Sequence, residues 1–133
     1  GYFNYANKVG IAIEVERTLK DSGEWELILK KYSEDYEHNE WGAPLKGVLF
    51  VVVNETDFYN IAVSLFSNTW KRRGEERFVD VSNPYAEFAR RHFLISTYEK
   101  LTDGKVFAYA GDHEFMEIVL TDMVEFISNR EGC

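Results

Sequence analysis

The segment over residues 47–53, Gly-Val-Leu-Phe-Val-Val-Val, constrains the fold more than any other part of this chain. Its side chains are apolar at both odd and even positions, whereas a strand with one face in water alternates apolar and polar residues. Continuously apolar strands occur in the middle of parallel or mixed sheets that helices cover on both faces. The segment therefore predicts an α/β fold with a mixed central sheet flanked by helices.

A second segment, residues 9–20, has the alternating pattern of a half-buried strand. Its β-branched residues fall on one side by parity, and Glu14, Glu16 and Lys20 fall on the other. Parity alone favours a solvated face for these charged residues. Because a helical segment and the buried strand follow, we predict instead a βαβ unit. In that unit two carboxylates and an ammonium group converge at one strand end.

Cap, turn and periodicity signals place the other elements along the chain. We expect a strand over residues 1–7 that turns at Asn7-Lys8, a helix from Ser22 with Asp21 as its cap, a helix from Thr56 or Asp57 to a stop at Gly74, and a strand over 78–81. Further on we expect a helix after Asn83-Pro84, a strand over 93–96, a short helix over 97–103, a strand over 106–110, a turn at Asp112-His113-Glu114 and a closing helix over 115–127, with a strand at 118–120 as the alternative.

Length and charge bound the class of protein. The 133 residues suffice for a single domain, and the net charge of −8 does not suggest a protein that coats nucleic acid nonspecifically. The same charge is compatible with a nuclease, since an acidic metal site is negative until its ion arrives.

Cys133 is the single cysteine, so no internal disulfide can form. No apolar stretch approaches the roughly 18 residues of a membrane span, and no secretory signal is visible. We therefore expect a cytoplasmic protein without membrane contact. The start at Gly1 rather than Met fits a fragment or a processed chain.

Basic residues cluster in two places. Lys71, Arg72, Arg73 and Arg77 lie together, and Arg90 and Arg91 form a second pair. One interpretation of the first group is the end of a helix, where cations complement the helix dipole. The other is a nucleic-acid contact, for which Lys71, Arg72, Arg73 and Arg90 are the candidates.

The order of these elements resembles the core of the PD-(D/E)xK nuclease superfamily. The resemblance lies in residues 12–20, Ala-Ile-Glu-Val-Glu-Arg-Thr-Leu-Lys, followed by Ile28-Leu29, Tyr32 and the buried strand. More narrowly, these residues are similar to replication-relaxation and mobilisation proteins of plasmids and other mobile elements. The similarity covers about residues 1–54, and it implies a restriction-endonuclease-like core.

The resemblance also implies a chemistry. Nucleases of this superfamily bind Mg²⁺, or Mn²⁺ in its place, through carboxylates, which are the hard oxygen ligands that such ions prefer. Glu14 and Glu16 match the ligand positions. The superfamily's Pro-Asp pair is absent, and Glu16 stands where its lysine would be, so Lys20 takes the role of electrostatic partner. The implied activity is Mg²⁺-dependent hydrolysis of DNA phosphodiester bonds, with Glu14, Glu16 and Lys20 as the catalytic residues.

Two alternatives are kept beside this hypothesis. One is a catalytically degenerate domain of the same fold that binds DNA or protein. The other is a small acidic interaction protein, such as a toxin-neutralising immunity protein, since acidic inhibitors can mimic nucleic acid against basic toxins. The nuclease hypothesis predicts that Glu14, Glu16 and Lys20 share one pocket, with Lys71, Arg72 or Arg90 near its rim. An open face paired with surface lysines would remove that basis.

Overall fold

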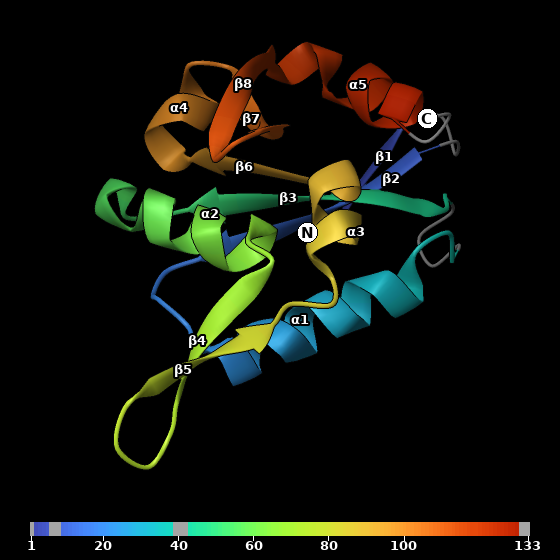
Figure 1. Ribbon diagram of the computed structural model, residues 1–133. Helices are drawn as coiled ribbons and strands as arrows, with labels where there is room; N and C mark the ends of the chain where they lie inside the picture. Colours follow the sequence, from blue (N-terminus) through green and yellow to red (C-terminus); the bar gives the residue numbers. More distant parts are fainter. Residues whose placement is uncertain (1, 6–8, 39–42, 131–133) are drawn as a thin grey trace.

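The computed structural model describes residues 2–5, 9–38 and 43–130. Its main feature is a six-stranded sheet of order β1-β2-β3-β6-β7-β8. The strands β2, β3 and β6 run parallel, and the other neighbouring pairs are antiparallel. Helices lie on both sides of this sheet (Figure 1). The predicted α/β class with a mixed, helix-flanked sheet is confirmed. The predicted turn at Asn7-Lys8 and Cys133 lie outside the described residues.

The elements alternate along the chain in the manner expected of βαβ units. In chain order they are β1 (Tyr2–Tyr5), β2 (Val9–Glu16), α1 (Ser22–Asp35), β3 (Leu45–Val52), the 3-10 turn η1 (Glu55–Asp57), α2 (Phe58–Phe66), β4 (Thr69–Arg73), β5 (Phe78–Ser82) and α3 (Ala86–His92). They continue with β6 (Phe93–Thr97), α4 (Tyr98–Thr102), β7 (Lys105–Gly111), β8 (Glu114–Val119), the 3-10 turn η2 (Leu120–Asp122) and α5 (Met123–Arg130).

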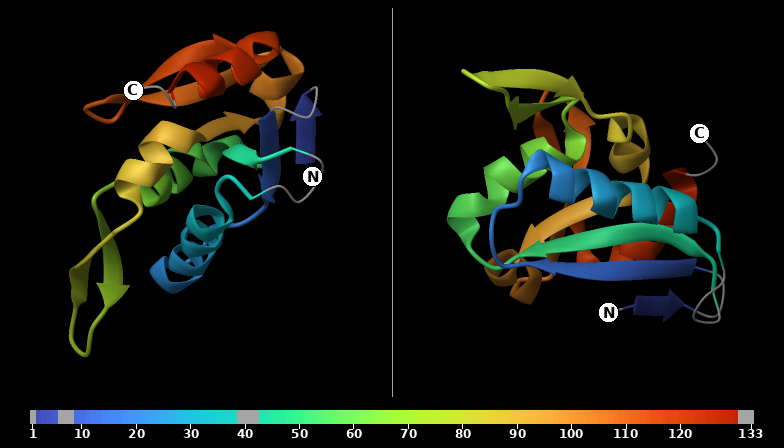
Figure 2. Two further views of the ribbon diagram at one scale, coloured as in Figure 1. Left: turned by 90° about the vertical axis from the view of Figure 1, so that its right-hand side faces the viewer. Right: turned by 90° about the horizontal axis from the view of Figure 1, so that it is seen from below.

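The central strand β3 is buried on both faces, as its sequence predicts. Phe50 points into a core that it shares with α1, α2 and α3, whereas Leu49 and Val51 point into a second core beneath α5. Both crossover connections, β2 to β3 through α1 and β3 to β6 through α2 and α3, therefore pass over the same face. Figure 2 shows α1 lying along β2 and β3 on that side. Side chains of β2 that point to this face lie beneath α1.

A two-stranded hairpin of β4 and β5 stands apart from the main sheet and projects away from the body (Figures 1 and 2). The predicted continuation of the second helix to Gly74 is wrong, because α2 ends at Phe66. The Trp70 side chain turns inward, and its indole N–H donates to the Ser64 carbonyl at 2.7 Å. Gly74 lies in the hairpin turn, where its N–H donates to the Arg77 carbonyl. The basic residues from 71 to 73 thus lie on a strand and do not end a helix.

The closing segment also differs from its prediction. Residues 114–119 form a strand, and α5 starts only at Met123, so a single helix over 115–127 is wrong. The cause is the turn at Asp112 and His113, which is confirmed. Both residues have positive φ, of 50° and 61°, the conformation of a tight hairpin turn. This turn folds β8 back onto β7.

The loop before α3 is held by one amide. Asn83 accepts a hydrogen bond from the Tyr85 N–H at 3.0 Å, and its own side chain donates to the Ser67 carbonyl at 2.8 Å. The expected helix after Asn83-Pro84 therefore begins at Ala86, slightly later than predicted.

None of the helices in the described ranges has the length and apolar content that a membrane span needs.

Candidate acidic site and adjoining basic groove

Glu14 and Glu16 point from β2 toward α1, on the buried face of the sheet. They pair in register with Phe50 and Val52 of the central strand, and the Glu16 side chain is only 2% exposed. A solvated face, which parity alone favours, is therefore wrong for Glu16. The burial follows from the crossover, which lays α1 over the side of β2 that carries the carboxylates. Val15, on the opposite side, is 42% exposed.

A buried carboxylate is costly unless it is paired, and Glu16 is paired with Lys20. The Lys20 ammonium donates to Glu16 Oε2, four residues back along the chain. The same ammonium lies 5.6 Å from the centre of the Trp25 ring, over its face, which favours a cation. The chain leaves β2 in this region, and the ion pair holds that exit against the first turns of α1.

Glu14 is bound by Tyr32, a buried residue of α1. The Tyr32 hydroxyl donates to Glu14 Oε1 at 2.6 Å. Burial, this hydrogen bond and the negative charges of Glu14, Glu16 and Asp35 raise the pKa of Tyr32 far above its usual value. The Tyr32 hydroxyl therefore keeps its proton at every physiological pH and remains a donor to Glu14. Both predicted carboxylates thus lie close to the same tyrosine.

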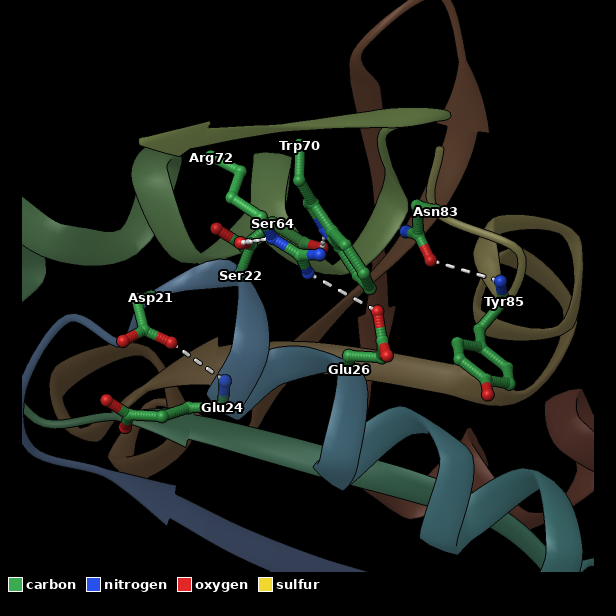
Figure 3. Close-up of polar contacts among 9 residues, drawn as sticks. All are labelled: Asp21, Ser22, Glu24, Glu26, Ser64, Trp70, Arg72, Asn83 and Tyr85. Carbon is green, nitrogen blue, oxygen red and sulfur yellow. Dashed lines mark hydrogen bonds and ion pairs between the residues drawn. The ribbon is translucent and has the colours of Figure 1, made fainter. Parts of the chain in front are cut away.

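The start of α1 was predicted correctly and positions this cluster. Asp21 caps the helix by accepting the Glu24 N–H at 2.8 Å (Figure 3). Trp25, Leu29 and Tyr32 then follow at intervals of four and three residues, so they form one buried stripe over the sheet. The packing of this stripe on the sheet positions the Tyr32 hydroxyl beside Glu14.

A groove of about 770 Å³ adjoins the cluster, between the start of α1, α2 and β4. Its cationic lining residues come from two separate segments, and the only carboxylate among the lining residues is that of Asp21. The cations are Lys20, Lys71, Arg72 and Arg73. Lys20 belongs both to this lining and to the ion pair with Glu16. The structure therefore brings three of the predicted nucleic-acid-binding residues next to the predicted catalytic lysine.

The individual basic side chains in the groove are held differently. Arg72 crosses to α1, where its guanidinium contacts Ser22 Oγ at 3.2 Å and Glu26 Oε2 at 3.4 Å (Figure 3). Lys71 pairs with Asp80 across the hairpin at 2.5 Å. The Arg73 guanidinium lies over the Phe78 ring, 5.7 Å from its centre. All three belong to exposed residues, so these contacts are weak enough to exchange for a ligand.

Two predicted features do not join this groove. Arg90 donates from Nε to the Phe66 carbonyl at 3.0 Å and lies over the Tyr109 ring, so it supports the packing of α3 instead. Glu14 and Glu16 do not line the groove. Lys20, the ion-pair partner of Glu16, does line it, so the expectation that Glu14, Glu16 and Lys20 share one pocket is not met in this groove.

The donor set decides whether a divalent cation fits the acidic cluster. Within residues 2–5, 9–38 and 43–130, no three His, Cys, Asp or Glu side chains form a group that could hold a metal. Mg²⁺, however, is usually held by one or two carboxylates together with substrate phosphates. Two carboxylates on one strand, Glu14 and Glu16, match that demand in number and in oxygen chemistry.

Sequence reasoning missed the partners of the acidic residues. Tyr32 was named only among the residues that carry the resemblance, with no role at the site expected for it. The signal for its role was that α1 must cover the side of β2 that bears Glu14. A second polar cluster was missed altogether, at the ends of β3 and β6. There Thr97 donates to Glu55 Oε1 at 3.3 Å, and a hydrogen bond to Glu55, with its negative charge, raises the pKa of Glu99. Glu55 and Thr97 adjoin the carboxyl ends of these strands, the edge where open α/β sheets bind ligands.

Comparison with known proteins adds no relative. No family model, no curated protein and no solved structure matches this chain.

Proposed function

We propose that this chain is a nuclease-like domain of a DNA-processing or mobile-element protein, which hydrolyses DNA phosphodiester bonds with Mg²⁺ or Mn²⁺. One observation carries the proposal. Lys20 pairs with the buried carboxylate of Glu16 and also lines a groove whose other cations are Lys71, Arg72 and Arg73. An acidic cluster therefore adjoins a local concentration of positive charge in a protein of net charge −8. The proposal includes DNA as the binding partner and the cytoplasm as the location of the protein.

In this proposal Glu14 and Glu16 hold the cation, and the groove holds the DNA backbone. A bound divalent cation supplies a water of lowered pKa and offsets charge that develops on the phosphate. The protein's own residues orient these groups. Tyr32 donates to one oxygen of Glu14 and holds that carboxylate in position. Lys20, which lines the groove, would supply positive charge beside a phosphate there.

The first experiment measures Mg²⁺ and Mn²⁺ binding by calorimetry, beside Glu14→Gln and Glu16→Gln. Both substitutions keep the size of the side chain and remove its charge. The proposal expects saturable binding by the wild-type protein that both variants lose, and nicking of plasmid DNA that depends on the same ions. Glu87→Gln, on an exposed helix face, is the matched control and should change nothing. Absence of saturable metal binding by the wild-type protein would overturn the hydrolytic function.

A second candidate is a domain of the same kind that binds DNA without cleaving it. It is favoured by the fact that both carboxylates already have partners within the protein, Tyr32 for Glu14 and Lys20 for Glu16. DNA binding that persists in EDTA, with no cleavage in either metal, would select this candidate. Cleavage that Glu16→Gln abolishes would select the nuclease.

A further inference from the structure

We propose that the groove between β4 and the first turn of α1 binds single-stranded DNA, with Phe78 as a stacking surface for a base. The inference rests on the proposed function and deepens it, since it specifies the form of DNA that the site accepts. Four properties carry it: the charge of the groove, the polar groups of its wall, the bridge across it, and the exposed aromatic ring on the hairpin.

The charge of the groove selects an anion. Its lining holds four cations and a single carboxylate, whereas the whole chain carries 23 acidic against 15 basic residues. Asp21 is already engaged as the helix cap. Among the described residues, Arg73 has an aromatic contact but no carboxylate partner. The geometry of a phosphate suits a guanidinium group, and a chain of phosphates suits several cations in succession.

The wall of the groove supplies hydrogen-bonding groups along its length. α2 and the segment that follows it contribute polar side chains, namely Asn60, Ser64, Ser67 and Thr69. On the other side Ser22 and Gly23 belong to the first turn of α1, where backbone N–H groups carry a partial positive charge. Such a lining suits the sugar and phosphate of a nucleic-acid backbone.

The bridge and the exposed ring point to a single strand. Arg72 spans from β4 to Ser22 and Glu26, so it ties the hairpin to α1 (Figure 3). Phe78 is 61% exposed on the neighbouring strand β5 and also lines the groove. In a duplex the base faces are already stacked on one another, whereas a single strand offers free faces to an aromatic ring. A cationic groove with an exposed aromatic residue is therefore suited to the unpaired strand.

The test measures DNA binding by fluorescence anisotropy in EDTA, so that hydrolysis plays no part. The probes are a labelled 15-nucleotide oligo(dT), an abasic oligonucleotide of equal length and a 15-base-pair duplex. We expect the wild-type protein to bind oligo(dT) most tightly. Phe78→Ala should weaken oligo(dT) binding by roughly 5-fold to 100-fold, the effect of losing one base–aromatic stack. It should leave the abasic probe unchanged, whereas Arg73→Gln should weaken both single-stranded probes.

Controls outside the groove use exposed residues of similar chemistry. Met116→Ala removes an exposed apolar side chain from β8, and Arg91→Gln removes an exposed cation from α3. Neither should alter binding, and circular dichroism should show that every variant is folded. Duplex binding as tight as oligo(dT) binding, or an unchanged affinity in Phe78→Ala, would overturn the inference. A single-strand preference without metal-dependent cleavage would overturn only the hydrolytic function, and a complete absence of DNA binding would overturn both.

Discussion

At the scale of single residues, the acidic cluster is defined by what each carboxylate contacts. Glu16 is buried with Lys20 as its counter-ion, and Glu14 is bound by a tyrosine hydroxyl that stays protonated. The two carboxylates therefore have different partners, a cation for Glu16 and a neutral hydroxyl donor for Glu14. This difference makes the pair distinguishable in solution, because the pKa of Tyr32 is strongly raised.

The stabilising contribution of Tyr32 to the free energy of unfolding should be lost at high pH. Its folded pKa lies above the unfolded value of about 10, so its contribution is complete below pH 10 and is lost as the pH rises further. The loss is at most about 1.4 kcal/mol per pH unit, since one proton is involved. Urea unfolding at pH 9 and pH 11 should show that the free energy of unfolding declines less for Tyr32→Phe than for the wild type. Tyr59→Phe, at an exposed position, should decline as the wild type does; an equal decline in all three proteins would contradict the prediction.

At the scale of elements, the first turn of α1 determines the site. The cap Asp21 follows Lys20 directly, Ser22 is the first helical residue and lines the groove, and the bridge acceptor Glu26 lies one turn further on. A change that frays this turn should therefore affect both stability and the shape of the groove. Gly47 of β3, by contrast, lies against the end of α3 and against Ile127 of α5, and none of these residues lines the groove, so a change there should affect stability alone.

Asp21→Ala removes the cap of α1 and should lower the free energy of unfolding by about 1 kcal/mol. The cause is the loss of the hydrogen bond to the Glu24 N–H, which leaves that donor without a protein partner. Asp21→Asn is the matched control, because asparagine caps helices about as well as aspartate. Urea unfolding at neutral pH gives the comparison. Equal losses in the two variants would show that charge, and not capping, is responsible.

Gly47→Ala should destabilise the protein by about 1–3 kcal/mol through overpacking. A Cβ atom at this position of β3 would lie 2.9 Å from the His92 carbonyl oxygen and 3.1 Å from Ile127 Cδ1. The carbonyl belongs to the backbone at the end of α3 and cannot move freely. Gly23→Ala serves as the comparison, since its nearest neighbour is a side-chain atom at 3.3 Å and alanine suits a helix. Thermal unfolding should separate the two, and equal midpoints would contradict the packing argument.

At the scale of the whole molecule, charge is distributed unevenly. The chain is acidic overall, yet the groove beside the hairpin is cationic. Such a distribution directs an anionic ligand to one place and repels it elsewhere. Binding to this groove should therefore be both local and strongly dependent on salt.

The salt dependence of oligo(dT) binding should report the number of phosphate contacts. Affinity is expected to fall linearly on a double-logarithmic plot against NaCl concentration between 50 and 200 mM, and Arg73→Gln should reduce the slope by about 0.7. Arg91→Gln, whose side chain pairs with Glu87 away from the groove, should retain the wild-type slope. Equal slopes in all three proteins would show that Arg73 contacts no phosphate.

The sequence predicted those features that depend on local pattern. The central strand followed from the segment over 47–53, whose side chains are apolar at odd and even positions alike, although β3 runs from Leu45 to Val52. The start of α1 followed from the Asp21 cap. The helix predicted over 115–127 was wrong, because its apolar residues match helical spacing whereas the left-handed turn at Asp112-His113 enforces a hairpin. That conformation of two non-glycine residues has no distinct signal in the pattern of hydrophobicity.

The candidate site was predicted only in part, because its contacts join distant segments. Glu14 and Glu16 share one side of β2 by parity alone, but their burial depends on the path of α1. The hydrogen bond from Tyr32 to Glu14 spans 18 residues, and the bridge from Arg72 to Ser22 spans 50. Such distances are fixed by the docking of whole elements. The basic residues 71–73 could not be placed until the hairpin was known to fold beside α1.

The order of strands in the main sheet has a consequence for how the protein is made. From β1 to β8 the strands lie side by side in the same sequence in which the ribosome releases them, and no later strand inserts between two earlier ones. Each new strand can therefore add to an edge that already exists, without reopening pairs that have formed. The sheet can grow during synthesis from the first hairpin onward. The acidic cluster and its helix would then be in place before the hairpin that completes the groove has left the ribosome.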